Sequence, residues 1–579
     1  MTPEVRTRSA WQESLALAQY LRDYAWAVPV MLTLGLFAAF ADTLSVSLAV
    51  MFLFSILGQT DDLVAGGGLM ARGFAWFNTL FGNAPGLIAG VFLGLILFNA
   101  LLVYIYQSMT AVFMNRIAER MRDLVHERYV KVGFRYIQER ERGELIHTLG
   151  TETWIVADAL FAIARIIIIM CAVAVIGAGL FALSWQIGLT AVVCALATFV
   201  VLLLLSKPLR RFGTATLAEN QILAERMLVS LQGMRTLRAF AQETYVLRVF
   251  GAASSKVRAL AIRAERLKAL IGPVGEIASL ASLVFIALVA GRAHIDVPTT
   301  VAAVLLLLRL QPQLRELDTH RLALAGMGAT LANLRATLDV HDKPWPTPGD
   351  RTFAGLRDVI AFEGVSFWHD KRRDPSLDNA RFEIRRGETT ILSGPSGSGK
   401  TTVINLILRL YEPDAGRITV DGADLLSLTR TSWLDRIAIA GQDVELIEGT
   451  VAQNLRLAKH DASFVELEAA CATVEILADI RAIPEGFDAR IGPGGLSFSG
   501  GQRQRLGLAR ALLRQPEILI LDEALSALEP ALEDRIRTAI AVAMAGKTIL
   551  VVSHRHDAKA SGDRVVHIEH GKIVAAPPA

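Results

Sequence analysis

Residues 394–401 read Gly394-Pro395-Ser396-Gly397-Ser398-Gly399-Lys400-Thr401, and they follow the apolar run Thr390-Ile391-Leu392. This stretch matches the Walker A pattern G-x-x-x-x-G-K-[ST] at every fixed position. Glycines let the backbone wrap closely around phosphates, so that successive N–H groups and the next helix start point at negative charge. We therefore predict that residues 394–401 and Thr402 bind a nucleotide, with Lys400 at the β/γ-phosphates and Thr401 on Mg²⁺.

The first half of the chain is strongly apolar. Six stretches are dominated by apolar residues, at 24–57, 86–113, 158–184, 186–206, 269–291 and 297–309. A helix needs about 20 apolar residues to cross a bilayer. Hydrophobic residues make up 53% of the chain and charged residues only 20%, against roughly 25% charged in soluble domains. This half is predicted as an all-α, six-helix transmembrane domain, and a soluble core is excluded for it.

Basic residues indicate the orientation of that domain. Lysines and arginines are frequent in the connection between the second and third stretches and in the one between the fourth and fifth. Segment 58–85, by contrast, contains only Arg72. The positive-inside rule places the two basic connections in the cytoplasm. We expect an integral, multi-pass protein of the cytoplasmic (inner) membrane with its C-terminal domain in the cytoplasm.

The N-terminal segment is predicted to lie on the membrane surface. Charged residues such as Arg6, Arg8 and Glu13 interrupt any apolar core of a cleavable signal peptide. Residues 10–22 are instead expected to form an amphipathic helix along the cytoplasmic surface. Its apolar side is predicted to carry Trp11, Leu15, Leu17 and Leu21.

A change in composition separates the two halves. Prolines and polar residues are concentrated in 341–350, which predicts a linker. Beyond it, short apolar strands alternate with helical segments, as in an α/β fold with a largely parallel sheet. The predicted organisation is a transmembrane domain at 1–340, a linker at 341–355 and a nucleotide-binding domain at 356–579. The three cysteines have no metal or redox spacing and are predicted to be buried apolar side chains: Cys171, Cys194 and Cys471.

Two adjacent carboxylates follow a buried-strand pattern in the second half. The run Ile518-Leu519-Ile520-Leu521 ends in Asp522-Glu523. Adjacent acids usually lie in a solvated turn, but an apolar strand that delivers them downstream of a Walker A motif favours catalysis. Asp522 is predicted to bind Mg²⁺, and Glu523 to polarise the water that attacks the γ-phosphate.

Further motifs resemble those of ABC transporter ATPases. The run Phe498-Ser499-Gly500-Gly501-Gln502 is similar to the family's signature sequence, which usually begins with Leu. Gln442 follows the strand-like run 437–440 as the Q-loop glutamine does, and Ser553-His554-Arg555 contains the family's histidine. Six membrane stretches on the same chain resemble the transmembrane domain of an exporter-type half-transporter. The resemblance spans nearly the whole chain.

The resemblance implies the ABC exporter fold, ATP and Mg²⁺ as cofactors, and a dimer. Gln442 would contact the metal or the water, and His554 would be catalytic. In the family the signature, here Ser499, Gly500, Gly501 and Gln502, faces the γ-phosphate held by the other subunit. A homodimer is expected. A heterodimer subunit and a non-transporting regulator or channel remain alternatives. Short coupling helices are expected within Tyr136–Leu149 and Thr214–Ala224.

Three positions depart from the family pattern. The tyrosine that usually stacks on adenine is replaced by His369, which leaves either His369 or Trp368 to stack. The D-loop has Glu529 where aspartate is usual. The segment before the signature, Gly492-Pro493-Gly494-Gly495, lacks the common glutamate. None of these changes removes a core catalytic group.

The substrate is constrained only by polar side chains within the membrane stretches. Such side chains are expensive in lipid, so they are expected to line a transport cavity, to pair with each other or to lie at an interface. A cavity with both signs of charge would accept a small amphiphilic substrate, such as a lipid, a peptide or a drug-like molecule, and no nucleic acid is expected as a partner. The candidates are Asp42, Asn99, Tyr104, Gln107, Arg165, Glu276 and Arg309.

Overall fold

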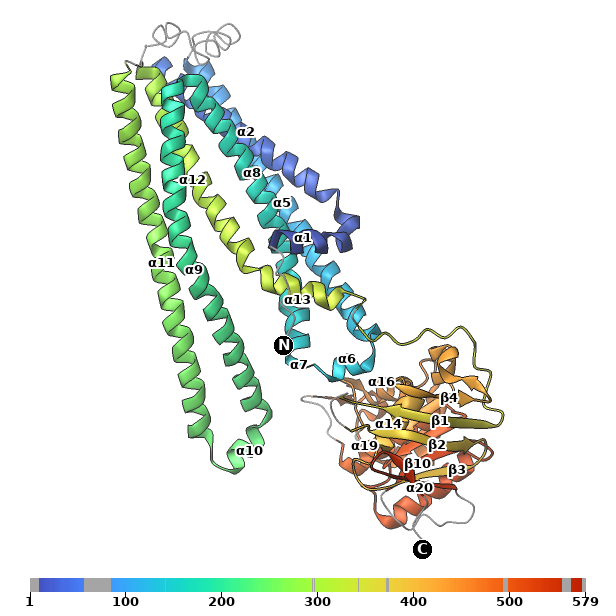
Figure 1. Ribbon diagram of the computed structural model, residues 1–579. Helices are drawn as coiled ribbons and strands as arrows, with labels where there is room; N and C mark the ends of the chain where they lie inside the picture. The colour runs from blue at the N-terminus through green and yellow to red at the C-terminus, as the bar shows by residue number, and fades with distance from the viewer. Residues whose placement is uncertain are drawn as a thin grey trace. The chain divides into compact units, whose positions relative to one another are not determined.

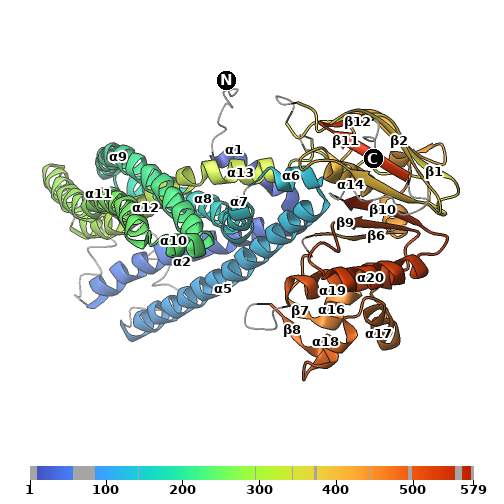
Figure 2. The same cartoon turned by 90° about the horizontal axis from the view of Figure 1, so that it is seen from below.

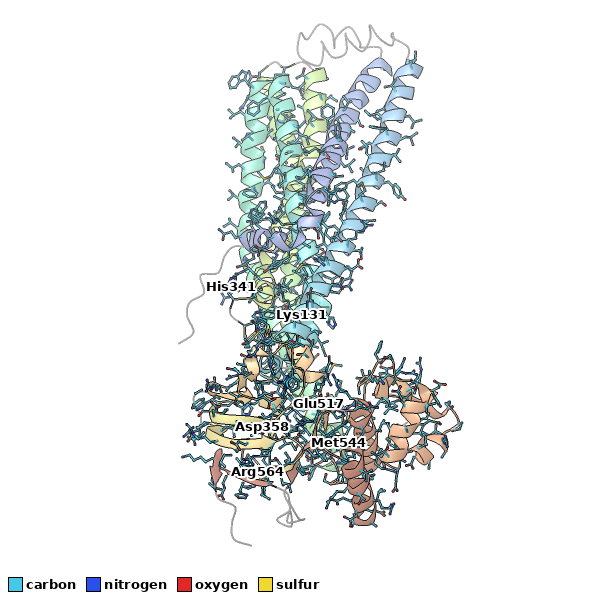
Figure 3. All side chains as sticks on the ribbon, turned by 90° about the vertical axis from the view of Figure 1, so that its right-hand side faces the viewer. Lys131, His341, Asp358, Glu517, Met544 and Arg564 are labelled. Carbon is cyan, nitrogen blue, oxygen red and sulfur yellow. The ribbon has the colours of Figure 1, made fainter. Side chains whose placement is uncertain are left out.

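The computed structural model describes most of the chain and divides it into two compact units. The first unit contains residues up to Lys131 and from Arg140 to Asp342, and the second contains Val132–Glu139 and the chain from Lys343 onward. The chain passes between the units three times, and Lys131 and His341, which lie next to the first and the last of these crossings, are labelled in Figure 3. Within helices some positions, Asp42 among them, are described by their backbone alone. The described residues are 10–56, 85–140, 142–293, 295, 297–341, 343–370, 374–442, 444–492, 498–553 and 564–574.

The described part of the first unit is helical, which confirms the predicted fold class for this half. Most of each of the six apolar stretches lies in one long helix (Figure 1). These helices are α2 (Ala27–Ile56), α5 (Pro85–Lys131), α8 (Thr153–Leu183), α9 (Trp185–Gln232), α11 (Glu243–Arg292) and α12 (Val297–Gly326). Shorter elements complete the unit: α1 (Ala10–Ala18), η1 (Gln19–Tyr24), α7 (Arg142–His147), η2 (Thr148–Glu152), α10 (Met234–Ala239) and α13 (Gly328–Leu338).

By length and apolar composition, three helices of the described chain qualify as membrane spans. They are the helices that contain Ala89–Lys131, Gly143–Leu183 and Glu243–Arg292. The number of candidate spans in the described chain rises to four if Ala10–Tyr24 and Ala27–Ala41 are counted as one span. These two segments are bent by 97° relative to each other. The apolar part of α9, Trp185–Val201, is shorter. The chain is therefore a multi-pass membrane protein.

Three helices are much longer than a bilayer requires. α5, α9 and α11 contain 47, 48 and 50 residues. At about 1.5 Å per residue each is roughly 70–75 Å long, whereas the hydrocarbon core is about 30 Å thick. Their basic portions therefore extend out of the membrane. α9 and α11 run side by side and are joined by α10 (Figures 1 and 2).

The structure corrects the predicted position of the second coupling helix. Residues Thr214–Ala224 lie inside the continuous helix α9. They contain alanine, leucine and glutamate and neither glycine nor proline, so nothing in this segment interrupts a helix. The chain breaks later, at Gly233, and the short helix is α10. In the first connection, short helices do occur in the expected region, as α6 (Phe134–Gln138) and α7.

The N-terminal helix forms as expected, but its apolar side was predicted wrongly. Leu17 and Leu21 are buried, whereas Trp11 is 38% and Leu15 54% exposed. Helical positions advance by about 100° per residue, so side chains two apart, such as Leu15 and Leu17, point in opposite directions. The buried side also carries Glu13, whose carboxylate pairs with Arg335 of α13 at 2.6 Å.

The second unit contains an antiparallel sheet and a mainly parallel sheet, both accompanied by helices, as the α/β prediction requires. A four-stranded sheet has the order β2-β1-β4-β5, and a six-stranded sheet has the order β12-β11-β3-β10-β9-β6. The first comprises β1 (Val359–Phe367), β2 (Leu377–Arg385), β4 (Ala415–Val420) and β5 (Ala423–Asp424). The second comprises β3 (Thr389–Ser393), β6 (Ile437–Ala440), β9 (Ile518–Asp522), β10 (Thr548–Ser553), β11 (Arg564–Glu569) and β12 (Lys572–Val574). β7 (Gly449–Thr450) pairs with β8 (Arg490–Ile491).

Two apolar cores divide the helices of this unit between them. The first core surrounds Phe367, Ile404 and Trp433, and includes α14 (Lys400–Ile407) and α15 (Arg430–Leu434). The second core surrounds Cys471 and Leu506 and includes residues of five helices: α16 (Val451–Arg456), α17 (Phe464–Thr473), α18 (Leu477–Arg481), α19 (Gly500–Leu513) and α20 (Pro530–Ala543). Figure 2 shows α14 beside the strands, and α19 together with α16, α17 and α18.

The polar segment predicted as a linker is bound along the second unit. The Thr347 N–H and hydroxyl donate hydrogen bonds to the Glu412 carboxylate at 2.6 and 2.8 Å. Gly349 lies so close to Leu428 that an added Cβ would come within 1.8 Å of the Leu428 carbonyl oxygen. This stretch is therefore a fixed part of the unit's surface. The predicted boundaries at residues 340 and 356 stay a prediction.

The cysteines differ in burial. Cys471 is fully buried in the second core, as predicted, and burial raises its pKa to about 12. Cys171 and Cys194 are half-buried. All three thiols are free.

Candidate nucleotide site

Four parallel strands bring the predicted catalytic segments to one edge of the larger sheet. β10 lies between β3 and β9, with Ser553 level with Ser393 and Val552 level with Asp522. β6 pairs with β9 so that Ala440 is level with Leu521. The carboxyl ends of parallel strands meet at the same edge, where α/β sheets bind ligands. The segments that follow β3, β6, β9 and β10 therefore lie together.

The loop after β3 has the backbone that a phosphate cradle needs. Gly394, Gly397 and Gly399 have φ values of +148°, +77° and +113°, which other residues rarely adopt. An added Cβ at Gly394 would lie 2.1 Å from the Ile568 carbonyl oxygen. The Ser398 hydroxyl is buried and has no hydrogen-bond partner among the described residues. A phosphate oxygen in the loop would satisfy it.

Lys400 begins α14 and turns back into this loop. Its ammonium donates hydrogen bonds to the carbonyls of Gly394 and Pro395, both at 2.8 Å. Burial lowers its pKa, and the charges of Glu523 and Asp522 oppose that shift. The ammonium is thus held within electrostatic range of both carboxylates. Thr401 is exposed and Thr402 is buried in the first turn of α14, while Pro395 and Ser396 are exposed at the loop tip.

The acid pair sits where β9 leaves the sheet. Asp522 ends the strand, and both carboxylate residues are half-buried. Glu523 has a φ of +52°. A left-handed conformation in a residue other than glycine costs of order 1–3 kcal/mol and is concentrated at functional sites. The strained backbone therefore supports a functional role for Glu523.

The other two catalytic candidates follow the neighbouring strands. Gln442 is exposed just beyond the end of β6, next to the strand that carries Asp522. His554 directly follows Ser553, the last residue of β10, but itself lies outside the described residues. The side-chain oxygens of Thr401, Gln442 and Asp522 are of the type that Mg²⁺ prefers, together with substrate phosphates.

The signature residues open helix α19 in the second core. Ser499 is its N-cap, and its hydroxyl accepts a hydrogen bond from the Gln502 N–H at 3.2 Å. The Gln502 side-chain oxygen accepts a hydrogen bond from the Ser499 N–H at 2.9 Å, and its amide nitrogen donates to the Asp479 carboxylate. Gly500 is exposed and Gly501 half-buried in the first turn. A helix N-terminus that is ordered by a capping box and open to solvent suits an anion.

No motif predicted the contact between α19 and the segment after β9. Gln504, which is 4% exposed, accepts a hydrogen bond from the Ala527 N–H at 3.0 Å. Its amide donates to the Ser526 hydroxyl at 3.3 Å. An added Cβ at Gly501 would lie 3.3 Å from the Ala527 carbonyl oxygen. The signature helix and the D-loop are therefore positioned by one glutamine.

The two candidates for base stacking lie at the end of β1. The His369 side chain is exposed, and its Nε2 is 3.4 Å from the Thr402 hydroxyl of the phosphate-binding helix. Trp368 is half-buried, and its N–H donates to Asp414 at 3.0 Å. His369 contacts α14 through Thr402. Which ring stacks on a base stays a prediction.

Known proteins match both halves of this architecture. Residues 377–526 match the family described as "ABC transporter", and residues 31–315 match the "ABC transporter transmembrane region". The chain belongs to the ABC transporter family. It is an exporter-type half-transporter, with a transmembrane region and an ATP-binding domain on one chain, and it is an ATP hydrolase coupled to transport.

Relatives of this ABC transporter resemble it over most of their length. The heterocyst differentiation ATP-binding protein HepA of a Nostoc species is 31% identical over 461 residues, or 79% of this chain and 76% of that protein. The ATP-dependent lipid A-core flippase of Thiobacillus denitrificans is 32% identical over 490 residues, or 83% and 84%. A solved structure of a bacterial Atm1-family ABC exporter with ATP bound has a TM-score of 0.77 at 23% identity, and the match covers 96% of this chain and 95% of that one. That last likeness shows the shared fold.

The candidates for a substrate cavity are dispersed over the transporter's membrane helices. Arg165 of α8 pairs with Glu316 of α12 at 2.6 Å, so it joins two helices. The Asn99 Oδ1 atom is buried and accepts no hydrogen bond from the described residues. The Asp42 side chain lies outside the described part of the structure. The remaining candidates are exposed on this chain: Tyr104, Gln107, Glu276 and Arg309.

Proposed function

We propose that this ABC transporter exports a small amphiphilic substrate across the cytoplasmic (inner) membrane as a homodimer, with ATP hydrolysed on the cytoplasmic side. The observation that carries the proposal is the distribution of the ATP site within the second unit. The phosphate loop, the acid pair and Gln442 converge on one sheet edge. The signature helix α19 belongs to the other apolar core.

A second copy would complete each site. One copy supplies Lys400 for the β/γ-phosphates, Thr401, Asp522 and Gln442 for Mg²⁺, and Glu523 and His554 for the attacking water. The other copy supplies the helix start at Ser499–Gln502, whose N–H groups suit a γ-phosphate. Because one chain carries both sets, twofold symmetry generates two identical sites. Binding would close this dimer and hydrolysis would open it, which couples nucleotide state to the membrane helices.

The exposed apolar side chains around α10 also support a dimer. Phe240, Tyr245 and Leu247 are 72%, 59% and 70% exposed, and Leu231 is 56% exposed. They lie where α9 and α11 meet at α10, in the basic connection that is expected outside the membrane. Apolar groups at such a site require a partner surface. A second copy supplies one in the proposed homodimer.

The proposed substrate class is a lipid-like amphiphile, with peptides and drug-like molecules as alternatives. Several relatives are named as lipid A-core flippases, and substrates of that kind carry both charged and apolar parts. The membrane helices of this chain offer charges of both signs, at Arg309 and Glu276 for example. An amphiphile could use both the charges and the apolar surface around them.

A ligand screen in lipid nanodiscs tests transport class and cargo together. Lipids, short peptides and drug-like amphiphiles are added to the purified full chain, and ATP hydrolysis is measured. We expect stimulation by at least one amphiphile, and its ATP-dependent uptake into inside-out vesicles. ATP binding without any stimulated turnover would instead favour a regulator or channel.

Cysteine crosslinking tests the homodimer. In a background without Cys171, Cys194 and Cys471, cysteines are placed at Ser396 and Ser499, both of which are exposed. Disulfide-linked dimers should increase with ATP in the Glu523→Gln protein. Background yields together with a co-purified homologous subunit would replace the homodimer by the heterodimer.

A further inference from the structure

Helix α6 of the first cytoplasmic connection contacts the segment that is proposed to hold the nucleobase. α6 belongs to the second unit. Arg135 Nη2 donates a hydrogen bond to the main-chain carbonyl of His369 at 2.8 Å. The same guanidinium lies 5.8 Å from the centre of the Phe367 ring. Arg135 therefore contacts the chain on both sides of Trp368.

A cluster of rings extends this contact. Phe367 stacks on Tyr411 with ring centres 4.9 Å apart, and the His369 ring meets Tyr411 edge-on at 5.5 Å. Tyr411 in turn contacts α6, since its hydroxyl donates to the Gln138 side chain and its ring lies 6.2 Å from Phe134. α6 thus holds the end of β1 both directly and through Tyr411.

His369 joins this cluster to the phosphate-binding helix. Its imidazole Nε2 is 3.4 Å from the hydroxyl of Thr402, which is 4% exposed in the first turn of α14. Burial and the charge of Arg135 lower the pKa of His369, while Glu139 opposes the shift. A neutral ring can accept a hydrogen bond from Thr402. The imidazole is therefore held between Tyr411 and α14, while α6 binds the main chain of the same residue.

The direction of the Arg135 side chain is set by an ion pair. Its Nε lies 2.8 Å from the carboxylate of Glu139, the residue that follows the end of α6. The α6 segment is anchored as well, because the Gly133 N–H donates to the Pro344 carbonyl at 2.8 Å. An added Cβ at Gly133 would lie 2.4 Å from that carbonyl oxygen. The guanidinium thus reaches His369 from a fixed backbone with a fixed side-chain direction.

We propose that Arg135 is a positioning residue for nucleobase binding, which fixes the His369 segment from the first cytoplasmic connection. The geometry makes ATP affinity depend on where α6 lies, and makes the position of α6 depend on an occupied base site, since such coupling is reciprocal. This inference rests on the proposed role of the His369–Trp368 segment in base stacking. It concerns the base alone and leaves the phosphate contacts unchanged.

The test separates base binding from phosphate binding. The full-length Arg135→Ala protein is assayed for ATP hydrolysis, with inorganic tripolyphosphate, which has no base, as a competitor of ATP. We expect the KM for ATP to rise about tenfold, as for loss of a hydrogen bond from a charged donor. The kcat and the tripolyphosphate Ki should stay within about twofold of wild type. Arg135→Lys, which keeps the charge and one donor, should give an intermediate KM.

Lys131→Ala is the matched control. It removes one positive charge from the same connection, where Lys131 pairs with Glu127 at 2.6 Å and is 66% exposed. Its KM for ATP should equal that of wild type. An unchanged ATP KM in Arg135→Ala, or an equal rise in ATP KM and tripolyphosphate Ki, overturns the inference. Absence of ATP hydrolysis in the wild-type protein would refute the proposed function instead.

Discussion

In the second unit, polar side chains converge on one edge of a parallel sheet, whereas in the first unit they are spread along helices of 30 to 50 residues. A parallel sheet aligns the ends of its strands through backbone hydrogen bonds, so strands remote in sequence deliver their next residues to one place. Helices have no such shared edge. Their side chains meet only where two helices pack.

The Arg165–Glu316 pair illustrates the second case. It joins α8 and α12 across 151 sequence positions, and neither residue lies in a motif. The phosphate loop, by contrast, spans eight consecutive residues whose backbone must take defined φ values. A site that depends on local backbone geometry is visible in sequence. A site that depends on how helices pack together has no such local sequence pattern.

We expect the largest loss of ATP turnover from removal of the Glu523 carboxylate. Glu523→Gln keeps the shape but cannot polarise the attacking water, so we expect ATP turnover to fall about 10²-fold or more with ATP binding retained. Steady-state hydrolysis and nucleotide binding are measured on the full chain. Glu517→Gln is the control, because Glu517 (labelled in Figure 3) precedes the same strand at its opposite end, where it pairs with Arg436. Near-normal ATP turnover in the Glu523→Gln protein would show that Glu523 does not polarise the attacking water.

Two glycine variants test whether ATP binding depends on the backbone conformation of the loop after β3. Gly394→Ala would place a Cβ 2.1 Å from the Ile568 carbonyl oxygen, whereas Gly397→Ala meets no atom within 4 Å. Both require a left-handed residue, at a cost of roughly 1–2 kcal/mol, and Gly394→Ala adds a steric clash. We expect Gly394→Ala to lose ATP binding and lower the unfolding temperature, and Gly397→Ala to be much milder. Equal effects in both variants would contradict the argument.

The membrane unit can be tested by a double-mutant cycle on Arg165 and Glu316. If the pair joins two helices, the single variants Arg165→Ala and Glu316→Ala should each destabilise the protein and the double variant should not add their effects. A coupling of about 0.5–1.5 kcal/mol is expected for this partly exposed pair. Thermal unfolding in nanodiscs measures it. Additive effects, with only Arg165→Ala changing substrate-stimulated hydrolysis, would assign Arg165 to the cavity instead.

The smallest expected effect concerns the D-loop. Glu529 is the N-cap of α20 but makes no side-chain capping hydrogen bond. Aspartate is one methylene shorter and is a preferred N-cap. Glu529→Asp should therefore stabilise the protein by about 0.5–1 kcal/mol, seen as a small rise in unfolding temperature. Glu529→Gln, equally long and uncapped, serves as the control. A lower unfolding temperature in Glu529→Asp would show that the longer side chain makes a contact of its own.

Prediction from sequence was accurate where one local rule decides the outcome. The glycine-rich loop after β3, the strand that ends in Asp522 and the α/β class of the second half required only motif and periodicity. Prediction failed where the outcome depends on which way a helix faces or where it ends. Leu15 and Leu17 lie on opposite sides of the N-terminal helix, and α9 continues through Thr214–Ala224 to Gly233.

The sequence by itself determined the two-part organisation, because apolar stretches of spanning length and a glycine-rich phosphate loop impose their structures locally. It also determined which groups are available for ATP chemistry. Only the tertiary structure decided that residues 132–139 pack with the second unit, that Arg135 bonds to His369, and that Gln504 joins α19 to the D-loop. These contacts join residues up to 273 positions apart, as between Gln138 and Tyr411. They form because folding brings surfaces of complementary shape and charge together, and no local pattern encodes that meeting.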